Sequence, residues 1–288
     1  MWLFFSVLSA FTQATYQAVS KRFTKNLSPY VLGSGNFFVA FPFLIGYVLL
    51  KGWPHLNNEF FIALFATASL NVVAAILFLK ALRNVDLSVA SPIIALTPMF
   101  NLFTSYFILG EAPKILGAAG VAIIVFGLII ITHKHREKND FAIEADTEKQ
   151  KQGMLFLFMT AFIFSISSNY DKLVAINSTP LFATFSTLAL IGFVMLLIAI
   201  SKKEYRVLRD GNNFRKLIIL GLIFAVAAFV WFAALSRGLV VYSIAIKRLS
   251  VLVGVGYGYF WFKEKNIRRR LAGAAIVLIG LGFIIFFK

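Results

Sequence analysis

The sequence contains no cysteine and few charged residues. Without Cys it excludes disulfides, thiolate metal sites and cysteine nucleophiles. Only 14% of its 288 residues are charged, whereas a soluble domain has about 25%. The three histidines, His55, His133 and His135, lie in hydrophilic segments and form no metal-ligand pattern. We therefore expect no metal and no cofactor, and the lack of a nucleophile–base set argues against an enzyme.

Long runs of apolar residues make up most of the chain. Hydrophobic residues make up 60% of it, and Phe alone contributes 33. Apolar runs near the ~20 residues that cross a bilayer core as a helix recur along the whole chain. We predict an all-α integral membrane protein with ten transmembrane helices. The predicted spans are residues 2–20, 30–50, 60–82, 87–109, 114–132, 153–171, 180–200, 216–236, 239–262 and 269–287.

The first half of the chain recurs in the second half. Glu111 recurs as Glu264, Gly120 as Gly273 and Gly127 as Gly280, each 153 positions later. Because each half holds five spans, the second must enter the membrane from the opposite side, which makes the repeat inverted. Inverted repeats are typical of transporters, whose substrate site lies between the halves. The predicted organisation is a first repeat over 1–132, a hydrophilic linker over 133–152 and a second repeat over 153–288.

The net charge of +16 raises the question of nucleic-acid binding. The basic residues lie in short segments between apolar spans, so we expect contact with lipid headgroups and no nucleic acid. The loops after spans one, three, five, seven and nine hold 20 Lys and Arg, against 5 on the opposite side. The positive-inside rule then predicts both termini outside the cytoplasm.

Polar side chains recur at helical spacing in spans one, four, six and nine. Four such stripes predict a shared water-accessible cavity, while hydrogen bonding between helices would explain any single Ser or Thr. Two prolines inside span four predict bends, and matching glutamates at the ends of spans four and nine predict caps or hinges. The substrate-binding candidates are Gln13, Gln17, Thr97, Asn101, Asn169, Ser243 and Ser250, and the hinge candidates are Pro92, Pro98, Glu111 and Glu264.

The adjacent pair Lys247–Arg248 lies within span nine. Two cations in hydrocarbon are expensive unless paired or hydrated, and such residues are functional by default. A planar guanidinium beside a mobile ammonium suits a phosphate or carboxylate. The alternative is that the pair snorkels or pairs with Asp171 or Asp86. The repeat counterparts are Ile94 and Ala95, so the charge is confined to one half.

The first half contains the motif SPIIALTPMFNLFTSYFILGE followed by LGAAGVAIIVFGLII. The second half matches it with AIKRLSVLVGVGYGYFWFKEK followed by LAGAAIVLIGLG. With these segments the chain resembles the EamA-type branch of the drug/metabolite transporter superfamily. The resemblance implies a central cavity built by spans one to four and six to nine. The superfamily includes amino-acid and multidrug exporters, nucleotide-sugar carriers and plastid sugar-phosphate carriers. The last group has a Lys–Arg pair in the ninth span that contacts phosphate, which implies that role for Lys247 and Arg248. Relatives keep both termini in the cytoplasm, opposite to the charge count.

We therefore predict a secondary transporter that moves a small, anionic metabolite, phosphorylated or carboxylated, by alternating access. The predicted location is a bacterial or archaeal plasma membrane. The alternative is an exporter of amino acids or hydrophobic drugs. A channel or lipid scramblase is less favoured, because the polar stripes form no continuous pore. Two halves in one chain suggest that a monomer suffices, and a homodimer stays open.

Overall fold

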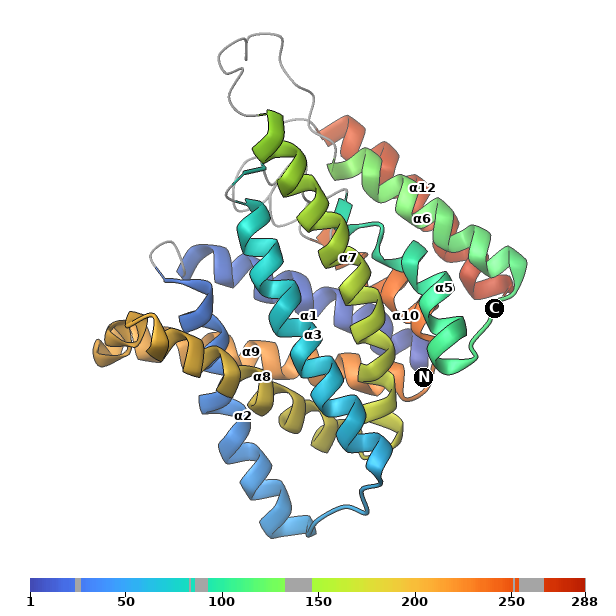
Figure 1. Ribbon diagram of the computed structural model, residues 1–288. Coiled ribbons are helices and arrows are strands. Elements are labelled where there is room, and N and C mark those ends of the chain that lie inside the picture. Colours follow the sequence, from blue (N-terminus) through green and yellow to red (C-terminus); the bar gives the residue numbers. More distant parts are fainter. Residues whose placement is uncertain are drawn as a thin grey trace. The chain divides into compact units, whose positions relative to one another are not determined.

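The computed structural model describes residues 1–23, 27–82, 84–85, 93–132, 147–250, 252–253 and 267–287 (Figure 1). Every regular element in these ranges is helical, as predicted. The elements are α1 (Trp2–Phe23), α2 (Pro29–Lys51), α3 (Asn58–Leu82), α5 (Thr97–Leu109), α6 (Ile115–Thr132), α7 (Thr147–Ile176), α8 (Pro180–Ser201), the 3-10 helix η1 (Glu204–Arg209), α9 (Gly211–Leu235), α10 (Val240–Lys247) and α12 (Ile267–Phe287).

Five of the described helices, α2, α3, α7, α8 and α9, are long and apolar enough to cross a membrane. The apolar parts of α6 and α12 are shorter. Helices α5 and α10 cover only parts of the spans predicted at 87–109 and 239–262, and residues 87–92 and 254–262 lie outside the described ranges. The number of ten spans therefore stays a prediction.

The linker predicted over 133–152 lies mostly outside the described ranges. Residues 133–146 lie outside the described ranges, but α7 begins at Thr147 and so includes the last six residues of that segment. These residues are good helix formers, and Lys151 lies 3.2 Å from Glu148 one turn earlier on the exposed surface. Helix α7 thus extends beyond the predicted span at both ends.

The described chain forms two compact units, and each combines segments from both halves of the sequence. Unit 1 contains residues 1–72 and 167–257, and unit 2 contains 73–166 and 258–288. Helices α3 and α7 contribute to both. In unit 1, α2 packs against α8 so closely that a Cβ added at Gly192 would lie 2.3 Å from the backbone nitrogen of Phe37. The core here contains Val39, Ala40 and Leu188.

Different loops contact each other at the two ends of unit 1. At one end Ser28, the N-cap of α2, hydrogen-bonds Glu204 in η1. At the other end Asn57, before α3, donates to Asn177, after α7, over 2.7 Å. The first contact joins the loops after spans one and seven, and the second joins those after spans two and six. This is the arrangement expected for spans that alternate in direction.

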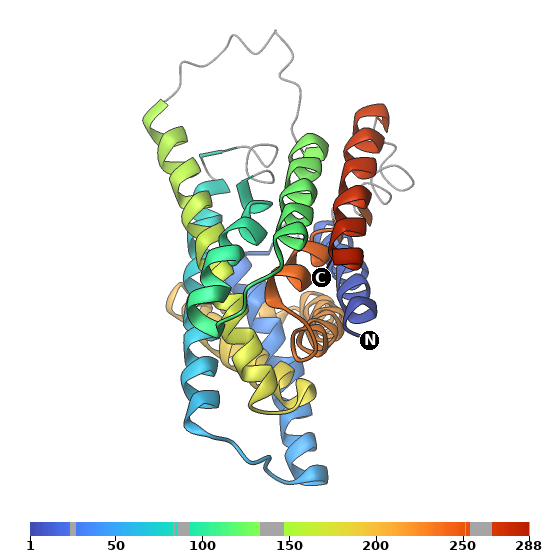
Figure 2. The same cartoon turned by 90° about the vertical axis from the view of Figure 1, so that its right-hand side faces the viewer.

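In unit 2, α6 and α12 lie side by side in both views (Figures 1 and 2). A Cβ added at Gly280 would lie 2.7 Å from the carbonyl oxygen of Gly120, and one added at Gly127 would lie 2.9 Å from that of Gly273. These two contacts are equivalent under the repeat, because Gly280 corresponds to Gly127 and Gly120 to Gly273 at the offset of 153 residues. Small residues thus let two repeat-related helices approach closely, and they contact each other as two-fold related elements do.

Candidate functional site

Spans four and nine are interrupted at equivalent positions. In span four the helix gives way to a turn at Ala95–Leu96 before α5 begins, and in span nine the turn is at Arg248–Leu249, after α10. The backbone bonds around the two turns match residue for residue. In span four, the Leu96 N–H donates to the Ile93 carbonyl over 3.1 Å, and the Leu96 carbonyl accepts from Met99 over 2.9 Å and from Phe100 over 3.3 Å. In span nine, the Leu249 N–H donates to the Ile246 carbonyl over 2.9 Å, and the Leu249 carbonyl accepts from Leu252 over 2.9 Å and from Val253 over 3.3 Å.

Pro98 explains the interruption in span four. It has no N–H, so it cannot donate to the carbonyl of Ile94 four residues earlier. The Thr97 hydroxyl donates to that carbonyl over 2.6 Å instead. An unsatisfied carbonyl is costly in a membrane, so Thr97 stabilises the break. Pro98 therefore lies at the start of α5, directly after the turn, rather than in the middle of a helix.

In unit 1, a buried polar network surrounds Asp171 on α7. The hydroxyl of Thr67 on α3 donates to Asp171 Oδ1 over 2.6 Å, and the indole nitrogen of Trp231 on α9 donates to Oδ2 over 3.1 Å. Thr67 also lies 2.9 Å from the Ser167 hydroxyl. Asn71 donates to Ser167 Oγ over 2.7 Å and to Thr67 Oγ1 over 3.1 Å. Three helices thus converge on one carboxylate.

Lys247 completes this cluster from α10. Its Nζ lies 3.9 Å from the centre of the Trp231 ring, a close cation–π contact. The charges of Lys247 and Asp171 also attract each other. Lys247 is the last residue of α10 and Arg248 is its C-cap. The negative end of the helix dipole lies there and stabilises each cation by about 0.3–1 kcal/mol. The predicted pair is therefore at the end of a helix, not within a continuous one.

The structure brings several predicted residues into unit 1. Ser243, one turn before Lys247 on α10, is fully buried, and its hydroxyl has no hydrogen-bond partner within the described part of the chain. Ser250 and Asn169 are also buried, and Gln13 is half-buried. Gln17 belongs to α1, but its side chain lies outside the described part.

Other predicted residues belong to unit 2 or fall outside the described ranges. Thr97 and Asn101 are fully buried in unit 2, where the Ser105 hydroxyl donates to the Asn101 carbonyl. Glu111 directly follows Gly110, which ends α5 in the left-handed conformation, and its N–H donates to the Ser105 carbonyl over 3.2 Å. Gly110 itself donates to the Tyr106 carbonyl over 3.0 Å, which is the five-to-one bond of an αL helix end. Pro92 and Glu264 lie outside the described residues.

Sequence reasoning missed most of the Asp171 network. Thr67 with Asn71, and Ser167 with Asp171, are polar pairs spaced by four residues in apolar helices, so each pair shares a helix face. That spacing could have indicated two facing polar patches. Trp231 gave a second signal, since a Trp inside a membrane span needs a partner for its N–H.

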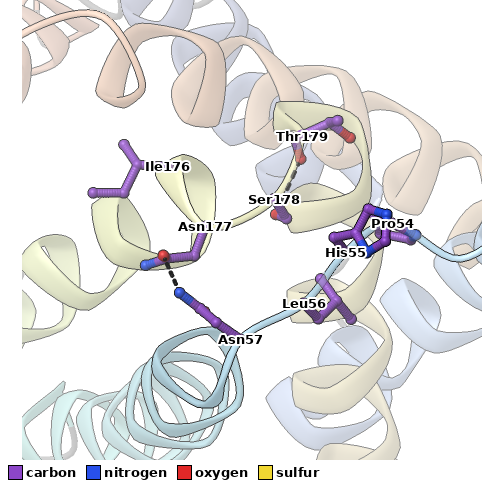
Figure 3. Close-up of a pocket in the computed structure, with 8 residues that line it drawn as sticks. All are labelled: Pro54, His55, Leu56, Asn57, Ile176, Asn177, Ser178 and Thr179. Atoms are coloured by element: carbon purple, nitrogen blue, oxygen red, sulfur yellow. Dashed lines mark hydrogen bonds between the residues drawn. The ribbon is translucent and has the colours of Figure 1, made fainter.

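A surface pocket of about 510 Å³ lies at the end of unit 1 where α3 begins and α7 ends (Figure 3). Figure 3 shows Asn57 pointing toward Asn177 across it. Asp171 lies six residues before Asn177, or about 9 Å along α7 at about 1.5 Å per residue. The lining residues are Pro54, His55, Leu56, Asn57, Ile176, Asn177, Ser178 and Thr179.

Comparison with known proteins decides the family. The sequence profile of the EamA-like transporter family matches residues 1–133 and 151–286. The chain belongs to this family. The resemblance to the EamA-type branch of the drug/metabolite transporter superfamily is thereby confirmed. Family membership and the apolar helices make the chain an integral, multi-pass membrane protein.

Two curated relatives are more distant. An uncharacterized transporter of Clostridium kluyveri is 23% identical over 50% of this chain and 47% of its own length. A WAT1-related chloroplastic protein of Arabidopsis thaliana is 23% identical over 86% of this chain and 62% of its own. The chain thus spans less than two thirds of either relative. A protein crystal structure superposes with a TM-score of 0.72 over 98% of this chain and 99% of its own, at 17% identity, which shows the fold alone.

Proposed function

We propose that this EamA-family protein is a secondary transporter that carries a small anionic metabolite, phosphorylated or carboxylated, by alternating access. The observation that carries the proposal is the position of Lys247 and Arg248 at the interruption of span nine. Discontinuous helices at corresponding positions of two repeats are where transporters bind their substrates. Only the interruption in span nine bears charge.

The charges near this interruption favour an anion. Lys247 and Arg248 carry two positive charges, and Asp171 carries the one negative charge that acts on Lys247 among the described residues. The side chains of Lys247, Arg248 and Asp171 thus comprise two cations and one carboxylate, and the two cations would attract a negative substrate. The guanidinium can bind a phosphate or carboxylate with two parallel hydrogen bonds.

Ser243 supplies a candidate polar contact for the same substrate. It lies four residues before Lys247, so the two side chains share one face of α10. A buried hydroxyl with no partner in the described chain can donate to a substrate oxygen at little desolvation cost. Ser250 and Asn169 are further candidates from the sequence.

Two features support an alternating mechanism. The matched interruptions give each half a bend at the same place, and the α6–α12 contacts exchange under the repeat offset. Related halves of this kind can adopt two near-equivalent arrangements by rocking. We place the protein in a bacterial or archaeal plasma membrane, with the loops after odd-numbered spans in the cytoplasm, as the charge count favours.

The first test is a thermal-shift screen of the purified protein in detergent. Sugar phosphates, nucleotide sugars, carboxylates, amino acids and cationic dyes are compared on wild type, Arg248→Ala and the surface control Lys51→Ala. A ligand at 100 times its Kd stabilises the folded state by about 2.7 kcal/mol. We expect stabilisation by phosphorylated or carboxylated compounds in wild type and Lys51→Ala, and its loss in Arg248→Ala.

Uptake of the stabilising compound into proteoliposomes then tests transport itself. We expect uptake by wild type and Lys51→Ala, and none by Arg248→Ala at equal protein content. Stabilisation only by amino acids or dyes, unchanged in Arg248→Ala, would replace the anion proposal with the exporter alternative.

A further inference from the structure

We propose that Asp171 binds a proton and that this proton binds cooperatively with the anion at Lys247 and Arg248, so that the two are transported together. This inference rests on the proposed function, because it names the coupling ion of the same site. Asp171, Lys247 and Arg248 are each half-buried, which leaves them partly accessible to water and to a ligand.

The hydrogen-bond chain around Asp171 can serve both protonation states. With the carboxylate ionised, Asn71 donates to Ser167, Ser167 can donate to Thr67, and Thr67 donates to Asp171 Oδ1. Hydroxyl groups rotate freely between donor and acceptor. If Asp171 gains a proton, Thr67 can accept from it and turn its own hydrogen toward the Ser167 backbone carbonyl, 3.4 Å away. The Ser167 hydroxyl can then keep donating to Thr67, and Asn71 can keep donating to Ser167.

The geometry also selects the oxygen that binds the proton. The Trp231 indole nitrogen can only donate, so Asp171 Oδ2 stays an acceptor. Thr67 faces Oδ1 and can either donate or accept. The proton therefore belongs on Oδ1. No covalent bond changes: a proton moves from water to Oδ1 and the Thr67 hydroxyl rotates.

Lys247 couples the proton to the anion, because both compete for the same positive charge. The ammonium stands over the Trp231 ring and is attracted to Asp171, with Arg248 next to it repelling it. A proton on Asp171 removes that attraction and frees Lys247 to join Arg248 around an anion. Conversely, a bound anion attracts the Lys247 ammonium, so the ionised form of Asp171 loses part of its stabilisation by that charge.

The described groups around Asp171 come from α3, α9 and α7 itself, in addition to Lys247 from α10. Within the described chain, α3 presents Thr67 and Asn71 and α9 presents Trp231. On α7 itself, the neighbouring Lys172 donates to the Gly238 carbonyl over 2.7 Å. A monoanion and a proton that bind together carry no net charge. Cotransport therefore adds no charge to the membrane interior.

Sulfate is a suitable probe, because it resembles phosphate and does not titrate near neutral pH. Its apparent Kd is measured by isothermal titration calorimetry between about pH 5.5 and about pH 8, the range in which a perturbed carboxyl group can titrate. The variants are wild type, Asp171→Asn and the control Glu59→Gln, which removes an exposed carboxylate at the start of α3. Infrared difference spectra of the same samples follow the carbonyl band of a protonated carboxylic acid.

If one proton binds with each anion, the apparent Kd of wild type falls by up to about tenfold per pH unit as the pH is lowered. We expect the same in Glu59→Gln, a pH-independent Kd in Asp171→Asn, and a carbonyl band that grows on adding sulfate and is absent from Asp171→Asn. If Asp171→Asn does not fold, Asp171→Glu replaces it for the infrared band, which should then shift in frequency because a different carboxylic acid is protonated. Sulfate binding that is pH-independent in wild type overturns the coupling alone. Absence of sulfate binding at every pH overturns the anion proposal and the coupling with it.

Discussion

Trp231 is the residue that holds the two opposite charges of the cluster apart. Its N–H bonds the Asp171 carboxylate, while its ring face lies under the Lys247 ammonium. A Trp can do both because its edge is a donor and its face attracts cations. Neither charge depends on direct contact with the other, so each stays available for a proton or for a substrate.

Thr67 should be the most sensitive uncharged residue of the network. We expect Thr67→Val to lower the free energy of unfolding by about 1–3 kcal/mol, because the half-buried Asp171 carboxylate loses its shorter hydrogen bond. The measurement is the melting temperature in detergent. The control is Thr184→Val, since the Thr184 hydroxyl is equally buried but donates to the Pro180 carbonyl of its own helix. Equal losses in the two variants would contradict the assigned role of Thr67.

At the scale of single elements, Pro98 favours the interruption in span four because it removes an N–H donor. We expect Pro98→Ala to restore an N–H donor for the Ile94 carbonyl and so to slow amide hydrogen exchange around residues 93–101. The transport rate should fall by about tenfold, which corresponds to an activation barrier higher by about 1.4 kcal/mol. Stability should change little, because Pro is tolerated in the first turn of a helix.

Pro42 provides the control, since it lies inside the apolar helix α2. Pro42→Ala should leave turnover unchanged. If it slows transport as much as Pro98→Ala, the break at Ala95–Leu96 has no special part in the transport cycle.

The sequence predicts the helical elements well, but it predicts poorly which side chains contact each other across different helices. Apolar length and Pro98 indicated the helices and the site of the bend, because these depend on local chemistry. The turn at Arg248–Leu249 has no proline within the described residues around it, so only the repeat offset could have indicated it. Lys247 and Arg248 were identified as costly charges, but the proximity of Asp171, Thr67 and Trp231 depends on how three separate helices pack.

At the scale of the whole molecule, repeat-related glycines set the distance between α6 and α12. We expect Gly280→Ala to lower the melting temperature, because its Cβ would lie 2.7 Å from the Gly120 carbonyl oxygen and 2.8 Å from the Ile124 backbone nitrogen. Gly282 lies on the same helix with open space around it, so Gly282→Ala should be neutral or slightly stabilising. A similar melting temperature for the two variants would show that the close approach is unimportant.

The confinement of Lys247 and Arg248 to one half has an energetic consequence for the alternating-access mechanism proposed above. Two identical halves would make its two opposite-facing states degenerate, since each half would simply take the other's shape. Every difference between the halves lifts that degeneracy, and a charged pair opposite Ile94 and Ala95 is a large difference. In the empty state, the relative populations of the two states should therefore depend on the same residues that are proposed to bind the substrate. Replacing Lys247 and Arg248 by Ile and Ala should bring the two states closer to equal population, which accessibility labelling from each side of the membrane would measure.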